Sequence, residues 1–301
     1  MNYPVTTEDH SRCCLCHSTN TRILYTLNDI QVVRCLVCDL VSLAISLDRK
    51  TIEDMYGQGY FQERQEYFFH DSSPEKSGDL SESIQRNFSW GLSLIEQYAP
   101  GRQLLDFGCA VGSFLSMAKT AGWEARGIDI SEYAVSYCRN TLGHEANSGE
   151  LKDVNFPNEE FDVVTMWDVI EHLTDPLAEL REVNRILKPG GIVLVDTPNE
   201  DSFIRSLARI IYSATGGLVR YPIQKLYHQF HLYYFNRATL SKVFEKSGFE
   251  VMYMASRPIP DAKGRAGVLE RLLVNTVAIP ERVFERGFEL VAVARKSHGA
   301  K

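Results

Sequence analysis

The amino-acid sequence predicts an α/β chain with a doubly wound, mostly parallel sheet, preceded by a small cysteine-rich module. Three observations carry this prediction. Five of the seven cysteines lie in the first 38 residues. From residue 103 onward, short apolar runs typical of buried strands alternate with stretches of helical pattern, which is the order of β-α units. A loop over residues 108–112 with glycine at both ends joins the first of these strands to its helix.

The composition excludes several classes of protein. Of the 301 residues, 44% are hydrophobic and 24% charged, which rules out a disordered, collagenous or coiled-coil chain. The length corresponds to about two domains. We see neither a run of about 18 apolar residues nor a secretory leader, so we expect a cytoplasmic protein.

The net charge of −7 argues against a general nucleic-acid binder, but it conceals a split. Residues 1–199 carry 16 basic and 30 acidic residues, whereas residues 200–301 carry 16 basic and 9 acidic residues. The first part is therefore strongly acidic and the last third basic. We expect the acidic part to hold a cationic cofactor and the basic part to face an anionic acceptor or an anionic membrane.

The N-terminal cysteines form two Cys-x-x-Cys pairs, 18 residues apart, that predict a structural zinc site with Cys13, Cys16, Cys35 and Cys38 as ligands. Strand-like runs at 21–27 and 30–34, with a turn at 28–29, would fold the second pair beside the first as a zinc ribbon. Disulfides are disfavoured in a reducing compartment. Cys14 in place of Cys13, and His17, remain alternative ligands.

A strand–helix alternation fills the middle of the chain. We expect strands at residues 103–107, 124–129, 161–167 and 192–196, and a helix that starts with Asp175 as N-cap and Pro176 as first residue. Residues 188–191, Lys-Pro-Gly-Gly, are expected to end that helix. A helix over about 80–98 precedes the alternation. Helices at 202–212, 239–246 and 266–274 and strands at 250–255 and 288–294 follow it, with Arg205 and Arg209 off the apolar face of the helix at 202–212.

Two acidic residues at strand ends predict the ligand of the glycine-containing loop. The loop lacks the G-x-G-x-x-G pattern of dinucleotide sites, and Asp106 makes its pocket acidic. Asp129 ends the next strand, where a carboxylate accepts hydrogen bonds from both ribose hydroxyls. An adenosine with a cationic group, S-adenosylmethionine, fits this pair, with Asp106 holding the ammonium group directly or through water.

The motifs together resemble those of class I S-adenosylmethionine-dependent methyltransferases, specifically the quinone-methylase-like small-molecule group with an N-terminal zinc ribbon. They are residues 105–112 (Leu-Asp-Phe-Gly-Cys-Ala-Val-Gly), 127–130 (Gly-Ile-Asp-Ile), 161–172 and 187–191. Ala110 departs from the family, which usually has glycine there. The resemblance implies a seven-stranded sheet and three regions: a ribbon over 1–45, an irregular, aromatic-rich linker or lid over 46–79, and a methyltransferase domain over 80–301 with cap insertions near 200–235 and 258–285.

The same resemblance implies the residues of the cofactor site. Gly108, Cys109 and Gly112 would line the methionine side, and Ile130 would lie against adenine beside Asp129. The adenine edge would meet Glu150 and Leu151, and the methyl donor would lie above Trp167 and Asp168.

The acceptor side is less specified by the sequence. His172, His228 and His231 are candidate bases or hydrogen-bond partners, since a base is needed only where the acceptor must lose a proton. Tyr56 and Tyr60 are candidates to close over the substrate. As plain packing residues, all five side chains would have no role in catalysis.

We expect methyl transfer to O, N or C of a small molecule, such as an anionic sugar, a quinone or a natural-product intermediate. The alternatives are an RNA methyltransferase, disfavoured by the neutral ribbon, and a non-catalytic cofactor-binding module. The helices at 202–212 and 266–274 would cover the site, form a homodimer interface or rest on a membrane surface.

Overall fold

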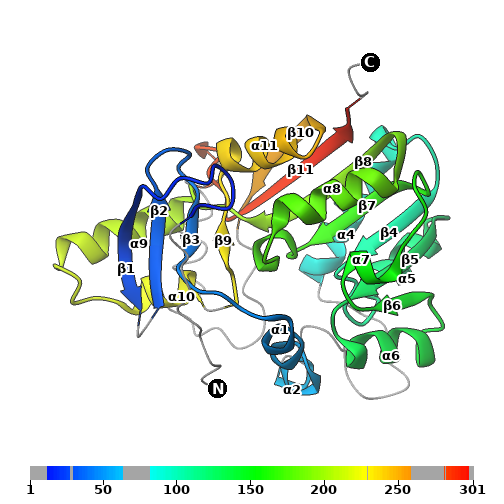
Figure 1. The fold of residues 1–301 in the computed structure, drawn as a ribbon, viewed down its shortest axis with the longest axis horizontal. Helices are drawn as coiled ribbons and strands as arrows, with labels where there is room; N and C mark the ends of the chain where they lie inside the picture. Colours follow the sequence, from blue (N-terminus) through cyan, green and yellow to red (C-terminus); the bar gives the residue numbers. More distant parts are fainter. Residues whose placement is uncertain are drawn as a thin grey trace.

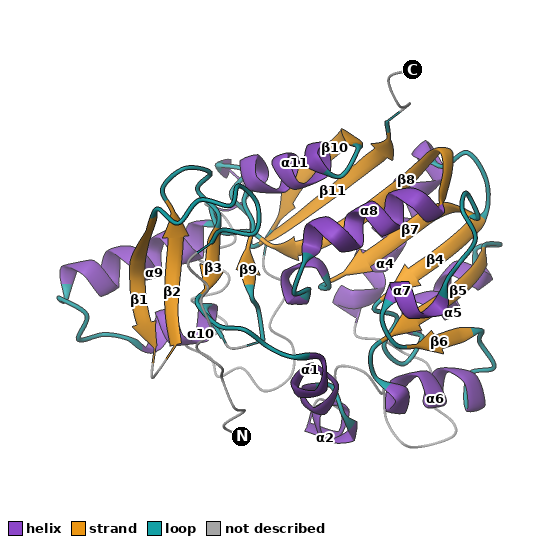
Figure 2. Ribbon diagram, viewed as in Figure 1, coloured by secondary structure: helices purple, strands orange, loops and turns teal. Residues whose placement is uncertain are grey.

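The computed structural model describes residues 12–27, 30–63, 82–228, 230–258, 281 and 283–297. Within them the chain forms two sheets that lie side by side, a large one with helices on both faces and a small one that begins with the N-terminal strands (Figure 1). Figure 2 shows the same arrangement by secondary structure.

The large sheet has seven strands in the order β10-β11-β8-β7-β4-β5-β6. Its parallel part consists of β4 (Gln103–Phe107), β5 (Glu124–Asp129), β6 (Ala146–Ser148), β7 (Phe161–Trp167) and β8 (Leu187–Pro198). The strands β10 (Phe249–Arg257) and β11 (Glu289–Lys296) extend it antiparallel. Successive strands β4, β5 and β6 run to one edge, and β7 then pairs on the other side of β4. The order therefore reverses between β4 and β7, where folds of this kind bind ligands.

Helices cover both faces of this sheet, as the doubly wound prediction requires. One core cluster joins the sheet to α8 (Pro176–Ile186) and α11 (Arg237–Lys246). A second joins it to α4 (Glu82–Tyr98), α5 (Ser113–Thr120) and α6 (Glu132–Asn140). The short helix α7 (Leu151–Val154) and the 3₁₀ turn η1 (Ile170–His172) complete this part of the fold.

Both ends of α8 are as expected, but the strand that follows it starts earlier than predicted. The Asp175 carboxylate accepts a 3.0 Å hydrogen bond from the backbone N–H of Ala178, and Pro176 follows it at the first helical position. The helix ends at Ile186, before the Lys-Pro-Gly-Gly run. Residues 188–191 belong to strand β8, which is longer than the predicted 192–196.

The small sheet combines segments that are far apart in the sequence. Its order is β1-β2-β3-β9, with β1 (Thr21–Leu27), β2 (Ile30–Cys35), β3 (Val41–Leu43) and β9 (Tyr233–Tyr234) all antiparallel. The helices α9 (Phe203–Ala214) and α10 (Tyr221–Leu226) contribute Ala208 and Ile223 to the same core. The elements α9, α10 and β9 therefore complete the N-terminal module, a partnership that was not predicted from the sequence.

The burial of Arg205 differs from the prediction for this region. It was expected off the apolar face of its helix, yet only 1% of it is exposed, whereas Ile210 on that face is 64% exposed. The Arg205 guanidinium lies 3.8 Å from the buried carboxylate of Glu200 and over the ring of Tyr227. The helix turns its charged side inward because Glu200 provides a buried counter-charge.

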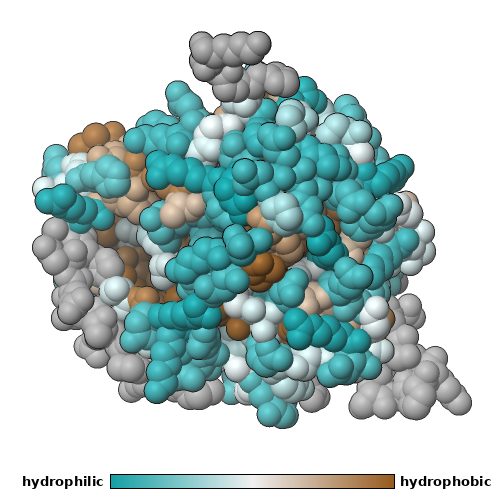
Figure 3. All heavy atoms as spheres, turned by 45° about the vertical axis from the view of Figure 1, so that its right-hand side comes forward, coloured by the Kyte–Doolittle hydropathy of each residue, from teal (hydrophilic) through white to brown (hydrophobic). Residues whose placement is uncertain are grey.

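The view in Figure 3 shows a mainly hydrophilic face with apolar atoms at its left edge and in a central hollow. Exposed apolar side chains of α9, α10 and their connection are Leu207, Ile210, Leu218, Val219 and Tyr221. No helix among the described residues is long and apolar enough to cross a membrane.

The segment that follows β3 is helical, whereas it was predicted to be irregular. It forms α1 (Arg49–Met55) and α2 (Gln58–Glu63). The Asp48 carboxylate accepts a 2.7 Å hydrogen bond from the backbone N–H of Thr51, which explains the start of α1. Residues 64–79 of the predicted linker and the helix expected at 266–274 lie outside the described residues.

Candidate active site

The loop after β4 is held in a conformation that needs glycine at both ends. Gly108 and Gly112 have φ angles of +82° and +90°. A Cβ atom on Gly108 would lie 2.3 Å from Val169 Cγ2, and one on Gly112 would lie 2.7 Å from Cys138 Sγ. Backbone conformation and close packing thus both exclude a side chain, and the loop can approach a ligand closely.

Asp129, the last residue of β5, fixes the middle of this loop. Its carboxylate accepts hydrogen bonds from the backbone N–H groups of Ala110 at 2.9 Å and Ser131 at 2.8 Å. Ala110 itself has a φ of +47°, a conformation that favours glycine, the residue that the resemblance led us to expect at this position. Burial raises the pKa of the Asp129 carboxyl group.

Asp106 lies in β4, beside the point where the strand order reverses. Its Oδ1 atom accepts a 2.7 Å hydrogen bond from the Thr165 hydroxyl of β7, and only 2% of the residue is exposed. Burial raises the pKa of this carboxyl group to about 7, and the nearby Asp129 charge adds to the shift. A cationic ligand beside this buried carboxyl group would stabilise its ionised form.

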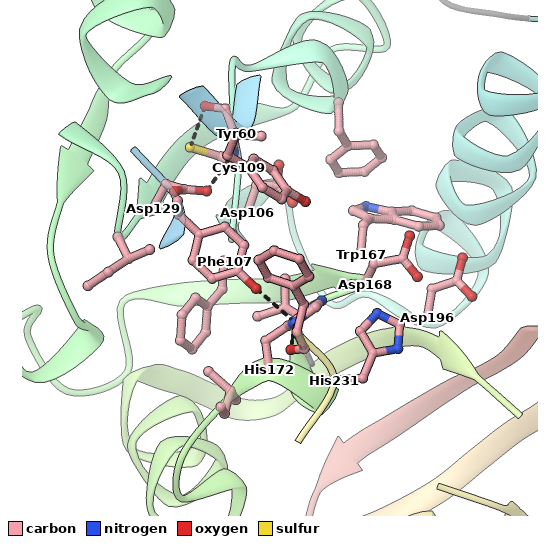
Figure 4. A pocket seen from close by; sticks show the side chains of 18 of the residues that line it. Tyr60, Asp106, Phe107, Cys109, Asp129, Trp167, Asp168, His172, Asp196 and His231 are labelled. Atoms are coloured by element: carbon pink, nitrogen blue, oxygen red, sulfur yellow. Dashed lines mark hydrogen bonds between the residues drawn. The ribbon is translucent and has the colours of Figure 1, made fainter. Parts of the chain in front are cut away.

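Both aspartates line a cavity of about 550 Å³, within the range of small-molecule sites of about 300–1,000 Å³. Figure 4 shows Cys109 and Asp129 toward one end of it and His172 and His231 toward the other. The predicted residues on its wall are Tyr56, Tyr60, Asp106, Gly108, Cys109, Asp129, Ile130, Glu150, Trp167, Asp168, His172, His228 and His231. Gly112 and Leu151 are not on the wall: Gly112 closes the loop, and Leu151 is fully buried in a core cluster.

The charge of the wall is one-sided. Among its described residues are seven acidic side chains and neither lysine nor arginine; the acids are Asp106, Asp129, Glu150, Asp168, Glu179, Asp196 and Glu289. Desolvation within the cavity, together with the neighbouring Asp196 carboxylate, raises the pKa of Asp168 to about 7. The cavity therefore favours cations over anions.

His172 is a partly buried, neutral imidazole with a defined proton. Its Nδ1 atom lies 2.5 Å from the carbonyl oxygen of Phe230, which only accepts, so Nδ1 carries the hydrogen. The Tyr56 hydroxyl lies 2.8 Å from the same nitrogen. Burial lowers the pKa of the imidazole to about 4, which leaves the lone pair on Nε2 at neutral pH.

The other two histidines lie next to it. The rings of His172 and His231 are 4.6 Å apart and those of His228 and His231 are 3.9 Å apart, measured between centroids. Burial lowers the pKa of His231 well below its usual value, and the neighbouring imidazoles add to this effect. The structure thus brings together three histidines that the sequence placed in two separate segments.

A second cluster, outside the cavity, contains the four predicted zinc ligands. Their sulfur atoms lie within 4.8 Å of one another, with Cys13 and Cys38 at 3.4 Å and Cys16 and Cys35 at 3.5 Å. These separations exceed a disulfide bond and approach the edge of about 3.8 Å in a tetrahedron with 2.3 Å Zn–S bonds. The four thiols thus fit a structural zinc ion.

The two cysteine pairs have the same backbone. In each, the residue directly after the second cysteine, His17 or Asp39, has a positive φ and donates its N–H to the carbonyl of the first cysteine. The His17 side chain is exposed and is not part of the cluster. Cys14 also lies outside it and contacts Tyr233, and burial raises its pKa to about 12.

Comparison with known proteins is consistent with this geometry. Residues 76–253 match the family described as "Methyltransferase domain". The chain belongs to this methyltransferase family. Solved structures similar to the methyltransferase chain include an S-adenosylmethionine-dependent methyltransferase from Archaeoglobus fulgidus, with a TM-score of 0.52 and 18% identity over 79% of this chain and 99% of that one. At this identity the likeness confirms the fold alone.

Relatives by sequence cover part of the methyltransferase chain. A Mycolicibacterium smegmatis protein named "Probable S-adenosylmethionine-dependent methyltransferase" is 32% identical over 50% of this chain and 53% of its own length. A ubiquinone biosynthesis O-methyltransferase of Methylococcus capsulatus is 35% identical over 39% of this chain and 50% of its own. The chain thus spans about half the length of the curated relatives it matches.

A similar fold also occurs in a protein that is named for a different reaction. The [4+2]-cyclase SpnF has a TM-score of 0.54 to the methyltransferase chain at 16% identity, covering 84% of this chain and 98% of that one. The fold by itself therefore does not specify the reaction, and the site must do so.

Sequence reasoning missed several residues of the site. Phe230 was not singled out, although its carbonyl group orients His172. Glu171 was missed as well: it is fully buried and its carboxylate lies next to two of the histidines. A signal for Glu171 existed, since it directly precedes His172, but no signal in the sequence identified Phe230.

Proposed function

We propose that this protein is an enzyme that transfers the methyl group of S-adenosylmethionine to a small-molecule acceptor. The observation that carries the proposal is the pair Asp106 and Asp129, two carboxyl groups with raised pKa at the carboxyl ends of β4 and β5 in one cavity. Family membership supports it.

The residues present fit this cofactor. Asp106 would hold the ammonium group and Asp129 the ribose hydroxyls, with Ile130 beside the adenine ring and Glu150 at its edge. When bound, the cofactor supplies an activated methyl group on a cationic sulfur. A cationic ligand also offsets the cost of burying carboxylates on a wall without a described lysine or arginine. The protein's task is then alignment of the acceptor, which contributes much of the rate.

The acceptor would bind at the opposite end of the cavity, against Tyr56, Tyr60 and the three histidines. These imidazoles are neutral where burial lowers their pKa, so they can accept a hydrogen bond from an acceptor hydroxyl or take its proton. We propose oxygen as the methylated atom. Relatives named as O-methyltransferases of ubiquinone biosynthesis and of malonyl-[acyl-carrier protein] support this choice.

The competing functions are less consistent with the cavity. An RNA substrate would bring phosphates to a wall lined by seven carboxylates. A non-catalytic module would have no need for the histidine-lined end of the cavity beside the cofactor carboxylates. An acceptor with an anionic group would place that group outside the carboxylate-lined wall, toward the basic last third of the chain.

The test is transfer of a labelled methyl group from S-adenosylmethionine to acceptors in parallel reactions: a hydroxylated aromatic ring, a nucleotide-linked sugar and structured RNA. We expect label in one of the small molecules and its loss in Asp129→Ala, with Asp54→Asn, an exposed aspartate on α1, as the matched control. Label in RNA alone, or cofactor binding without transfer to any of them, would contradict the proposal.

We also propose that Cys13, Cys16, Cys35 and Cys38 hold one structural zinc ion. All four positions of a tetrahedral shell are then filled by thiolates, so the ion stabilises the module rather than taking part in the reaction. Free thiols at these separations suit a reducing compartment, and we propose a cytoplasmic location on this ground.

A further inference from the structure

A third group of ligand-type side chains lies at the acceptor end of the cavity. Glu171 Oε1 is 3.8 Å from His172 Nε2 and 4.0 Å from His231 Nε2. One ligand atom from each of the three residues falls within 4.8 Å of the others. These separations are too long for hydrogen bonds. They are slightly longer than the edge of about 3.3–3.6 Å in a tetrahedron with 2.0–2.2 Å bonds, so a small shift of the side chains would let the three atoms share one metal ion.

The Glu171 carboxylate is held with one oxygen unused. The Thr197 hydroxyl donates a 2.8 Å hydrogen bond to Oε2, which fixes the side chain. The residue is fully buried, and Oε1 has no hydrogen-bond partner. Among the described residues, the basic groups within 4.0 Å of this carboxylate are the two imidazoles. An ionised carboxylate at this depth would be costly without a cation, and the described basic groups close to it are neutral or weakly basic imidazoles, so a metal cation beside this oxygen would stabilise the ionised form.

His172 is oriented in the way that metal-bound histidines are. Its Nδ1–H donates to the carbonyl oxygen of Phe230, so the lone pair is on Nε2, the nitrogen nearer to Glu171. A hydrogen bond from the distal nitrogen to a backbone carbonyl is the usual support for an imidazole ligand. His231 completes the set, and its Nδ1 atom has no hydrogen-bond partner among the described residues.

We propose that Glu171, His172 and His231 bind a divalent transition-metal ion that positions the acceptor oxygen. Two imidazoles and one carboxylate leave coordination positions open. Glu171 lies behind the wall, whereas both histidines line the cavity, so the open positions face the acceptor chamber. The ion would also allow an anionic oxygen to enter a chamber whose described wall has no lysine or arginine.

This inference rests on the proposed methyl transfer and specifies its acceptor: a molecule with a hydroxyl group, or two adjacent oxygens, able to coordinate a metal. With the ion bound, the lone pairs of His172 and His231 coordinate it and no longer act as bases. Coordination lowers the pKa of the hydroxyl, and its proton leaves to water instead. The oxygen then forms the bond to the methyl carbon while the carbon–sulfur bond breaks, and the bonding pair remains on sulfur. The ion keeps its charge, and no oxidant or reductant is needed.

The test uses Mn²⁺, because it favours nitrogen and oxygen ligands over the thiolates of the cysteine cluster. The full-length protein is titrated with Mn²⁺, and free Mn²⁺ is followed by electron paramagnetic resonance. We expect one bound equivalent in the wild type, and affinity at least tenfold lower in Glu171→Gln and in His231→Gln. His144→Gln, a histidine that hydrogen-bonds Ser116 away from the cluster, should bind like the wild type.

Circular dichroism and cofactor binding show whether each variant is folded. If wild type shows no saturable Mn²⁺ binding at millimolar ion, or if folded Glu171→Gln and His231→Gln bind as well as wild type, the ion site is wrong. These results do not depend on turnover. A protein that binds Mn²⁺ at this site but no S-adenosylmethionine would overturn the proposed function and leave the ion site standing.

Discussion

The Thr165 hydroxyl of β7 donates a 2.7 Å hydrogen bond to the Asp106 carboxylate of β4, across the point where the strand order reverses. This contact fixes a buried carboxyl group at the mouth of the crevice in which such sheets bind ligands. Because burial raises its pKa to about 7, this group changes charge near neutral pH. Cofactor binding should therefore depend on pH.

We predict that affinity for S-adenosylmethionine falls by about tenfold per pH unit well below pH 7, because only ionised Asp106 attracts the ammonium group. Affinity should level off as pH rises above about 7. Calorimetric titrations between about pH 5.5 and 8.5 measure this, and Asp106→Asn should flatten the profile. Asp129 and Asp168 also have raised pKa values, so a wild-type profile retained in Asp106→Asn would assign the effect to them instead.

Asp106 should also make the stability of the ligand-free protein depend on pH. Asp106 has a folded pKa above its unfolded value, so the native state holds the extra proton between about pH 3.9 and 7. Stability from this group is present at low pH and is lost as pH rises through about 7. Asp106→Asn should therefore raise the melting temperature at about pH 8 more than at about pH 5. An equal or opposite change at the two pH values would be inconsistent with a buried, neutral carboxyl group.

Glu200 should be the main electrostatic link between the two sheets. Its buried carboxylate lies 3.3 Å from Arg34 of β2 and 3.8 Å from Arg205 of α9. Glu200→Gln removes the charge and leaves Arg205 buried without a counter-charge, so we predict a loss of about 3–5 kcal/mol in the free energy of unfolding.

Denaturant unfolding measures this loss. The control is Glu96→Gln, which breaks the exposed pair with Arg102 and should cost about 0–1 kcal/mol. Similar costs for the two variants would mean that Glu200 does not stabilise the junction.

Adjacent cysteines provide a matched test of the zinc site. Cys13 has its sulfur in the four-thiol cluster, whereas Cys14 contacts Tyr233. We predict one zinc per chain by elemental analysis, retained in Cys14→Ser and lost in Cys13→Ser. Chelation of the ion should lower the melting temperature of wild type and Cys14→Ser. Zinc kept by Cys13→Ser but lost by Cys14→Ser would reverse the assignment of the ligands.

The elements with strong local signals were predictable. β1, β4, β5 and β7 have the predicted bounds, because each is a regular run with its own apolar pattern and end signals. The cysteine cluster followed from spacing alone. These features depend on residues close together in the sequence.

Features set by distant contacts were not predictable. The two-residue strand β9 exists because β3 is present to pair with it, about 190 residues earlier in the chain. Arg205 is buried because Glu200 and Tyr227 surround it, against its expected place off the apolar face. The Glu171–His172–His231 cluster likewise depends on the return of the chain at residue 231, which no local pattern specifies.

The central claim is that the crevice beside β4 and β5 binds S-adenosylmethionine, and isothermal titration calorimetry tests it most directly. Asp129 organises this crevice through its hydrogen bonds to the Ala110 and Ser131 backbone. We predict one equivalent bound by wild type and by Asp54→Asn, and affinity about tenfold or more lower in a folded Asp129→Ala. No saturable binding by wild type, or unchanged affinity in Asp129→Ala, would contradict the account.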